Sequence, residues 1–440
     1  MRNDLIVCIK IGGRMETNWN ASIVPIAKGS KLFETFDAGT YDKKVDEYIG
    51  LKGEQKALYK GKDDYVEKHG GPVLTPLNIN YKRIKDEVEL RIERGVAPEI
   101  LLIDSFMQDK LVQDLLSSLE NENHIKEIYP EKKLKVTGGI NTTEATVLME
   151  CIRQGRILLQ AGREAEMIAK PLIDFYAASA YAYAIIVINS PIRKSIDSLK
   201  GSHGHMYVHQ KSSIDFGGDI PSGTFLDLLG AIPMAQITTR NINLKYSLIN
   251  SIDVIQNHNI SISLLTLLSM VPELNKLYGL YDNQHKIVHK LNVDFQMVNT
   301  SVIYNFYIGD GIHKPGLERL KKQFKTERVT ENHGSLQVSV SLENLKDICP
   351  TIYQDIKGNL WYIESPIEGV VIPELCLHFL IISALCNIMR YSPHEWSNIL
   401  NNKISSQFSL LISEYIRLFE KKFPMLVVQY LTNYLPLLDN

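Results

Sequence analysis

Pro373-Glu-Leu-Cys-Leu-His378 opens a stretch of the chain that ends at Arg390-Tyr-Ser-Pro-His-Glu-Trp396. Nearly every position from 375 to 389 is apolar, so the stretch predicts a helix that is buried on most of its circumference. Pro373 suits the first position of a helix, and Glu374 beside it favours the positive end of the helix dipole. A buried helix near the C-terminus is therefore expected to organise the fold.

A second helix is predicted to begin within residues 390–396. Ser392 followed by Glu395 fits a capping box, with Pro393 at the first helical position. The apolar pattern then resumes towards Lys422-Phe-Pro424. The last seventy residues or so are thus expected to form a helical hairpin with a sharp corner.

Three residues are expected around this corner: Arg390, Tyr391 and Trp396. In the structural interpretation, Arg390 caps the carbonyls that end the first helix and Trp396 fills the corner. In the functional interpretation, Arg390 and His394 face a ligand. The structural interpretation is favoured, because no acid or nucleophile completes a catalytic set there.

The composition is that of a folded protein of two or three domains. Hydrophobic residues make up 45% and charged residues 22% of the 440 positions, and the net charge is −2. This charge argues against a general polyanion binder, so nucleic acid is possible but not indicated. Five cysteines without a C-x-x-C pair indicate reduced thiols, and the apolar run at the start is too short for a signal peptide. We expect a cytoplasmic protein.

Residues 171–188 form a second strongly apolar segment and raise the question of a membrane span. The segment is just shorter than a usual span, it carries Asp174 and Ser179, and tyrosines occupy its middle. A buried core helix fits these features better than a span does. No membrane association is expected.

The chain is expected to divide into residues 1–140, a mixed α/β region, and residues 141–440, a mainly helical domain. Helical spacing begins at Asn141 and continues to Lys170, whereas 100–103 is either a strand or a helix start. Several segments have strand-like patterns, namely 293–308, 335–342, 361–363 and 369–372. The predicted fold class is α+β and predominantly α-helical: a helical bundle with a small antiparallel sheet.

Two blocks of the sequence resemble one known family. The first is Arg156-Ile-Leu-Leu-Gln-Ala-Gly-Arg-Glu-Ala165, followed by Pro171-Leu and Phe175-Tyr176. The second is the Arg-Tyr-x-Pro-x-x-Trp pattern at 390–396 with the later Lys-Phe-Pro. Both are similar to segments of the YaaC-like family of bacterial proteins. The resemblance covers about residues 141–435, leaves the N-terminal region uncovered, and implies a helical fold without a particular activity.

A glycine-rich loop between 201 and 209 is the leading candidate for a site, and it holds three histidines: His203, His205 and His209. One of them could fix the loop backbone, or His203 could contact a ligand or phosphate together with Arg193 or Lys194. The three could also hold a metal, but no cysteine or HExxH helix accompanies them, so no metal or cofactor is expected. The resemblance implies a Gly-His-Gly here, which covers neither His205 nor His209.

Arg328-Val-Thr-Glu-Asn-His333 has the Arg-x4-His spacing of ribonucleases of the HEPN helical-bundle class. In that class the pair serves acid–base catalysis on RNA. The motif is short enough to arise by chance, and the strand pattern after Gly334 places His333 at a helix end. The basic stretch before it, 319–328, is more typical of a solvated helix face.

Two functions remain open. The first is a non-catalytic binding or regulatory protein that acts through a protein partner, a second copy of itself or a small ligand, with His203, Arg193 and Lys194 at the site. The second is a HEPN-like ribonuclease or toxin in bacterial stress or phage defence, with either Arg328 and His333 or the loop at His203 as its catalytic residues. The first is favoured, because the chain contains no recognised nucleotide-binding or hydrolase motif.

Overall fold

The computed structural model describes part of the chain. It comprises residues 92–94, 99–103, 108–121, 123, 125, 142–189, 203–216, 223–232, 234–238, 243–247, 251–252, 254–255, 258, 260–281, 287–298, 301–308, 329–332, 335–341, 351–432 and 434–438.

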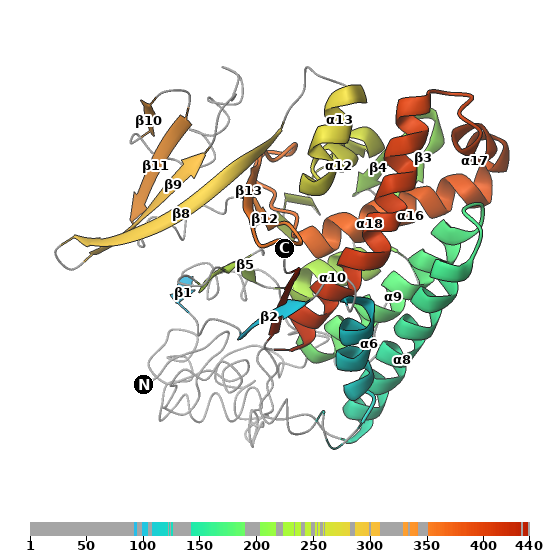
Figure 1. Ribbon diagram of the computed structural model, residues 1–440, viewed down its shortest axis with the longest axis horizontal. Helices are drawn as coiled ribbons and strands as arrows, with labels where there is room; N and C mark the ends of the chain where they lie inside the picture. The colour runs from blue at the N-terminus through green and yellow to red at the C-terminus, as the bar shows by residue number, and fades with distance from the viewer. Residues whose placement is uncertain are drawn as a thin grey trace, which may run out of the picture.

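The helices gather into one body, with α9 at its centre (Figure 1). Helix α9 packs against α8, α10, α16 and α18. The bounds are α6 (Gln108–Ser118), α8 (Thr142–Glu164), α9 (Lys170–Asn189), α10 (Thr224–Ala231), α12 (Leu264–Ser269), α13 (Asn275–Tyr281), α16 (Glu374–Tyr391), α17 (Pro393–Leu400) and α18 (Ser406–Leu431), with short 3-10 turns η3 (His209–Lys211) and η4 (Pro272–Leu274).

The strands form mostly antiparallel sheets at the edge of this body. The largest has the order β10-β11-β9-β8-β13-β12, and its hairpin of β8 and β9 extends away from the helices (Figure 1). Two three-stranded sheets have the orders β3-β4-β7 and β1-β6-β5, and β2 pairs in parallel with β14. The bounds are β1 (Ile92–Arg94), β2 (Glu99–Ile103), β3 (Met206–Val208), β4 (Ser213–Phe216), β5 (Met234–Thr238), β6 (Asn243–Ser247), β7 (Ile260–Ser263), β8 (Val288–Val298), β9 (Ser301–Ile308), β10 (Val329–Asn332), β11 (Ser335–Ser341), β12 (Ile352–Gln354), β13 (Leu360–Ile363) and β14 (Tyr434–Leu438).

The predicted fold class, α+β and mainly helical, is confirmed. One predicted strand is wrong, because residues 369–372 are irregular in structure. Their backbone groups bond to side chains instead of a neighbouring strand: Val371 N–H donates to Ser251 Oγ at 2.8 Å, and the Ile372 carbonyl accepts from the Tyr353 hydroxyl at 2.9 Å. The apolar side chains of 370–372 are nevertheless buried, which explains the strand-like pattern.

Helices α9 and α16 are buried in the core, as their composition predicts. Close packing of α9 on α8 requires a glycine, because a Cβ at Gly155 would lie 2.8 Å from the ring of Tyr181. Both helices are long and apolar enough to span a membrane, but 78% of the apolar window of each is buried inside the fold. Two helices that pass this test of length and composition are only weak evidence for a membrane span.

The segment before α8 contributes to the same core. Val112 and Leu116 of α6 are buried in the cluster that includes α8 and α9. Arg156 of α8 binds the turn that follows α6 through a bidentate ion pair. Its guanidinium donates to the two carboxylate oxygens of Glu120 at 2.5 and 3.1 Å. The expected division of the chain at residue 140 stays a prediction.

The helix expected to run from Asn141 to Lys170 ends earlier than predicted, because α8 ends at Glu164 and α9 begins at Lys170. Lys170 reaches back across the turn, where its Nζ donates to the carbonyls of Gly162 at 2.6 Å and Arg163 at 3.1 Å. A cation is well placed at a helix C-terminus, where carbonyls lack helical partners. Lys170 therefore closes α8 while starting α9.

Pro424 lies inside α18 and changes what its neighbours can bond. A proline has no N–H, so the carbonyl four residues before it, that of Glu420, loses its helical hydrogen bond. Arg163 of α8 supplies the missing donor, with its guanidinium 2.6 Å from the Glu420 oxygen. Lys170 also pairs with the Glu420 carboxylate. The proline thus creates a point at which α8, α9 and α18 join.

We predict that Arg163→Met destabilises the fold by about 1.5–3 kcal/mol, the usual contribution of a hydrogen bond to a charged group. In a Pro424→Ala background the new N–H of residue 424 can satisfy the Glu420 carbonyl, so the same substitution should have a smaller effect. Chemical denaturation of the two single variants and the double variant measures this coupling. Additive effects would contradict the assignment.

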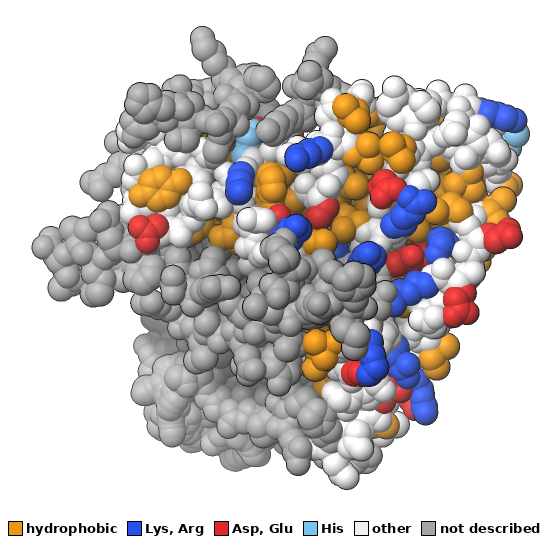
Figure 2. All heavy atoms as spheres, in the orientation of Figure 1, with side chains coloured by type: hydrophobic (Ala, Val, Ile, Leu, Met, Phe, Trp, Pro, Cys, Tyr) orange, Lys and Arg blue, Asp and Glu red, His pale blue; other side chains and the backbone are white. Residues whose placement is uncertain are grey.

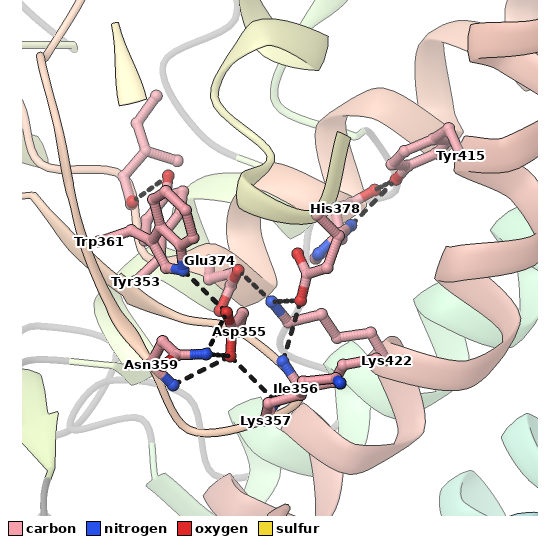
Figure 3. A network of polar contacts seen from close by, with 12 residues as sticks. Tyr353, Asp355, Ile356, Lys357, Asn359, Trp361, Glu374, His378, Tyr415 and Lys422 are labelled. Carbon is pink, nitrogen blue, oxygen red and sulfur yellow. Dashed lines mark hydrogen bonds and ion pairs between the residues drawn. The ribbon is translucent and has the colours of Figure 1, made fainter. Parts of the chain in front are cut away.

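A buried lysine joins the largest sheet to the helices (Figure 3). Lys422 of α18 donates from Nζ to Glu374 at 2.6 Å and to Glu273 at 2.7 Å. The same Glu273 oxygen accepts the backbone N–H of Ile356, in the turn between β12 and β13, at 3.0 Å. Although burial opposes it, the two carboxylates raise the pKa of Lys422. Burial raises the pKa of Glu374 despite the lysine beside it.

The turn between β12 and β13 is closed by Asp355 (Figure 3). Its carboxylate accepts the backbone N–H groups of Lys357 and Asn359, each at 2.9 Å, and the indole N–H of Trp361 at 2.9 Å. An aspartate that binds the backbone of the following residues stabilises a tight turn. This turn presents Ile356 N–H to Glu273 and so fixes the sheet against the helical body.

Replacement of Lys422 by Met is expected to destabilise the protein by about 3–5 kcal/mol, because the buried carboxylate of Glu374 and the half-buried carboxylate of Glu273 would lose their cation. Thermal unfolding of the variant beside Lys403→Met, at an exposed position, provides the comparison. A small loss equal to that of the control would show that Lys422 does not stabilise the pair.

Candidate functional site

The histidine loop, defined as residues 203–209, packs against the corner, defined as residues 390–396. Ser392 Oγ lies 3.0 Å from His209 Nδ1, and Glu395 Oε2 lies 4.0 Å from the same nitrogen. At the other end of the loop, the charge of Arg390 acts on His203. Two features that the sequence analysis selected separately thus lie together in the fold.

The loop is held in place by two glycines whose backbones touch. Gly204 has a φ of +80°, which favours glycine, and a Cβ on Gly223 would collide with the backbone of Gly204. This close approach brings the start of α10 to the loop, where Phe225 N–H donates to the His203 carbonyl at 2.9 Å. The glycine after His203 is therefore required by packing.

His205 has a structural position. Its Nδ1 lies 3.1 Å from the His203 carbonyl and its Nε2 lies 2.8 Å from Ser383 Oγ. Because a carbonyl only accepts, Nδ1 carries the hydrogen and Nε2 accepts from the serine. Burial, and then the neighbouring His203, lower the pKa of His205 to about 3. The ring is neutral and both nitrogens are occupied.

His203 is exposed on the loop, with its ring edge-on to Phe175 of α9 at a centroid distance of 5.0 Å. Partial burial, and then the charge of Arg390, lower its pKa. A neutral imidazole can donate from one nitrogen and accept at the other. At neutral pH, His203 therefore presents a neutral imidazole within reach of the positive charge of Arg390.

Ser392, His209 and Glu395 include the residue types of a hydrolytic triad, but their geometry differs from one. In a triad the acid and the nucleophile bind opposite nitrogens of the imidazole. Here the hydroxyl and the carboxylate both approach Nδ1. The contact with His209 also shows that the predicted capping box is wrong. Helix α17 does begin directly after Ser392, but the Ser392 side chain makes no cap hydrogen bond and contacts His209 instead.

No metal centre forms within the described residues, where no three His, Cys, Asp or Glu side chains could hold an ion together. In the loop, the ring centroids of His203 and His205 are 6.3 Å apart, and His205 is bound on both sides. The expectation of no metal and no cofactor stays a prediction.

The corner residues divide into buried and exposed. Trp396 is 1% exposed, and its indole N–H donates to the Ile168 carbonyl at 3.1 Å, in the turn between α8 and α9. Arg390 is exposed and lies over the Tyr391 ring at 4.8 Å, and Tyr391 is itself 62% exposed. Arg390 is thus available to solvent, as is His394 on α17.

The other predicted site residues lie outside the described part of the chain. They are Arg193, Lys194, Arg328 and His333. The four residues that separate the last two form strand β10, paired with β11. The expectation that a helix ends at His333 is therefore wrong, because strand pairing extends across this segment. The catalytic role of Arg328 and His333 stays a prediction, as does the ligand-binding role of Arg193 and Lys194.

Figure 2 shows one face of the molecule, where charges of both signs are interspersed with apolar side chains. Exposed apolar side chains in the described residues include Leu280 of α13 and Leu410 of α18, two helices that pack together. Among the described residues on this face, acidic side chains interrupt the basic ones.

A family model described as YaaC-like Protein matches residues 114–431, more than half of the chain. The chain belongs to the YaaC-like family. The match begins upstream of the predicted residue 141 and includes the end of α6. No curated protein and no solved structure matches the chain.

The two blocks that carry the resemblance meet in this YaaC-like fold. Arg163 of the first block bonds the carbonyl that Pro424 of the second leaves free. Trp396 bonds the turn that follows the first block. The signature of the family in this chain therefore includes residues that join its helices.

We expect Trp396→Ala to destabilise the YaaC-like fold by about 3–5 kcal/mol, because a buried indole and its hydrogen bond are lost. Tyr391→Ala, at an exposed neighbouring position, should change stability by less than about 0.5 kcal/mol. Denaturant unfolding of the two variants makes the comparison, and equal stabilities would show that Trp396 is not an anchor.

Proposed function

We propose that this YaaC-like protein is a non-catalytic binding or regulatory protein that binds a small ligand with a polar or anionic group where the histidine loop meets the corner. The observation that carries the proposal is that His203 and Arg390 are both exposed and that the charge of Arg390 reaches His203 and lowers its pKa. The ring of His203 packs on Phe175, and Arg390 lies in the last turn of α16.

The chemistry of the pair suits recognition. Arg390 offers a fixed positive charge with several N–H donors in one plane, which fits a carboxylate or a phosphate. His203 adds one donor and one acceptor. The Phe225 N–H fixes the loop backbone beneath His203, so the imidazole is held before a ligand arrives. Arg193 and Lys194 belong to the proposed site by sequence alone.

Two features favour binding over catalysis. The hydroxyl of Ser392 and the carboxylate of Glu395 share one nitrogen of His209, so the imidazole cannot relay a proton between them. The His205 imidazole is neutral and bonded on both sides, which removes the second histidine as an acid or base. The binding event would then act on a protein partner or a second copy of the chain.

The test is ligand capture by purified protein. Denaturing extraction followed by mass spectrometry should release a bound anionic metabolite from wild type and not from His203→Ala or Arg390→Ala. Arg417→Ala is the matched control, because Arg417 is an exposed arginine of α18 paired only locally with Glu414. All three variants should unfold within about 1 kcal/mol of wild type, since exposed side chains contribute little to stability.

Three results would overturn the proposal. The first is an anionic ligand retained equally by both site variants. The second is a large loss of stability in Arg390→Ala, which would return Arg390 to a structural role. The third is cleavage of RNA by wild type that disappears in His333→Ala and persists in His203→Ala, which would establish the ribonuclease alternative.

A further inference from the structure

Asp174 of α9 is completely buried, with 0% of its surface exposed. Neither carboxylate oxygen has a hydrogen-bond partner within the described residues. A buried ionised carboxylate without donors is very unfavourable, because burial removes its hydration and supplies nothing in return. An ionised Asp174 would therefore need a compensating charge close by.

The groups that face Asp174 come from three helices. Arg163 of α8 and Lys170 of α9 are cationic, whereas Glu420 of α18 is acidic, and Tyr415 of α18 is also close enough for Asp174 to raise its pKa, after burial itself. From α16, His378 bonds Tyr415. Two cations therefore face two carboxyl groups.

Neither cation donates a hydrogen bond to Asp174 within the described residues. Lys170 Nζ binds the carbonyls of Gly162 and Arg163 and the carboxylate of Glu420. Arg163 donates to the Glu420 carbonyl. On the remaining side, a Cβ at Gly162 would collide with an Asp174 oxygen, so the carboxyl group packs directly on the backbone of α8. No room is left there for a side chain to bring a donor.

We propose that Asp174 holds a proton in the folded protein at neutral pH, and that loss of this proton to solvent at alkaline pH loosens the packing of α9 against α8 and α18. Burial first, and then the charge of Glu420, raise the pKa of Asp174 to about 8, although Lys170 and Arg163 oppose the shift. The next residue, Phe175, contacts His203, so the device lies directly behind the histidine loop.

The sign of the pH dependence follows from the raised pKa. Between about pH 4 and pH 8 the unfolded chain releases this proton and the folded chain keeps it, so the contribution of Asp174 to stability falls as the pH rises. Above about pH 8 both states are ionised and the contribution is constant. Asp174→Asn removes the titration and keeps the shape.

The experiment measures the melting temperature from pH 5 to pH 9 for wild type and Asp174→Asn. The variant should gain on wild type by about 2–4 °C per pH unit up to pH 8 and then remain parallel to it. Asp215→Asn is the matched control. Although partial burial raises the pKa of Asp215, hydrogen bonds from Ser261 and Ser213 keep it below its ordinary value. The difference in melting temperature between Asp215→Asn and wild type should therefore not change from pH 5 to pH 9. Parallel curves for Asp174→Asn across the whole range would overturn the proposal.

A measurement on wild type alone covers the case in which the variant fails to fold. With aspartate labelled by ¹³C, the infrared band of a protonated aspartic acid should be present at pH 7 and vanish above pH 8. Amide exchange at the end of α8 and the start of α9 should accelerate over the same interval beyond the intrinsic effect of pH. Absence of the labelled acid band at pH 7, or unchanged exchange protection while the band vanishes, would contradict the proposal.

Discussion

The carbonyl of Glu420, left without a helical donor by Pro424, is the point on which the helical body depends. Arg163 fills this gap from α8, and Lys170 binds the carboxylate of the same residue from the start of α9. A single residue of α18 therefore fixes the ends of two other helices. The end of α8 and the start of α9 flank the turn to which Trp396 bonds. The position of the corner therefore also depends on the contacts of Glu420.

Periodicity and composition predicted the elements whose burial is uniform. Helices α9 and α16 are apolar on all sides because they are buried on most sides, so pattern and structure agree. Prediction failed where a side chain or carbonyl had a distant partner. Ser392 looked like a cap but contacts His209, 183 positions away in sequence. Lys170, which bonds the end of α8, has its acidic partner, Glu420, 250 positions away.

The candidate site was partly accessible from sequence for the same reason. His203 lies in a loop whose glycines mark an unusual backbone, and Arg390 lies beside a proline that marks a corner. Each was recognisable alone, whereas their proximity is a tertiary contact. Phe175 and Ser383, which support the loop from α9 and α16, were hidden inside apolar runs that read as core. Gly223 is a glycine because its backbone approaches that of Gly204 closely, and a glycine is the sequence feature that such a contact leaves.

The parallel pairing of β2 with β14 sets an order of events during synthesis. Tyr434 lies opposite Glu99 and Leu438 opposite Ile103, so the two strands are separated by nearly the whole described chain. A contact of such long sequence separation forms slowly and late. During synthesis, β2 must therefore remain without this partner strand until residue 438 has emerged from the ribosome.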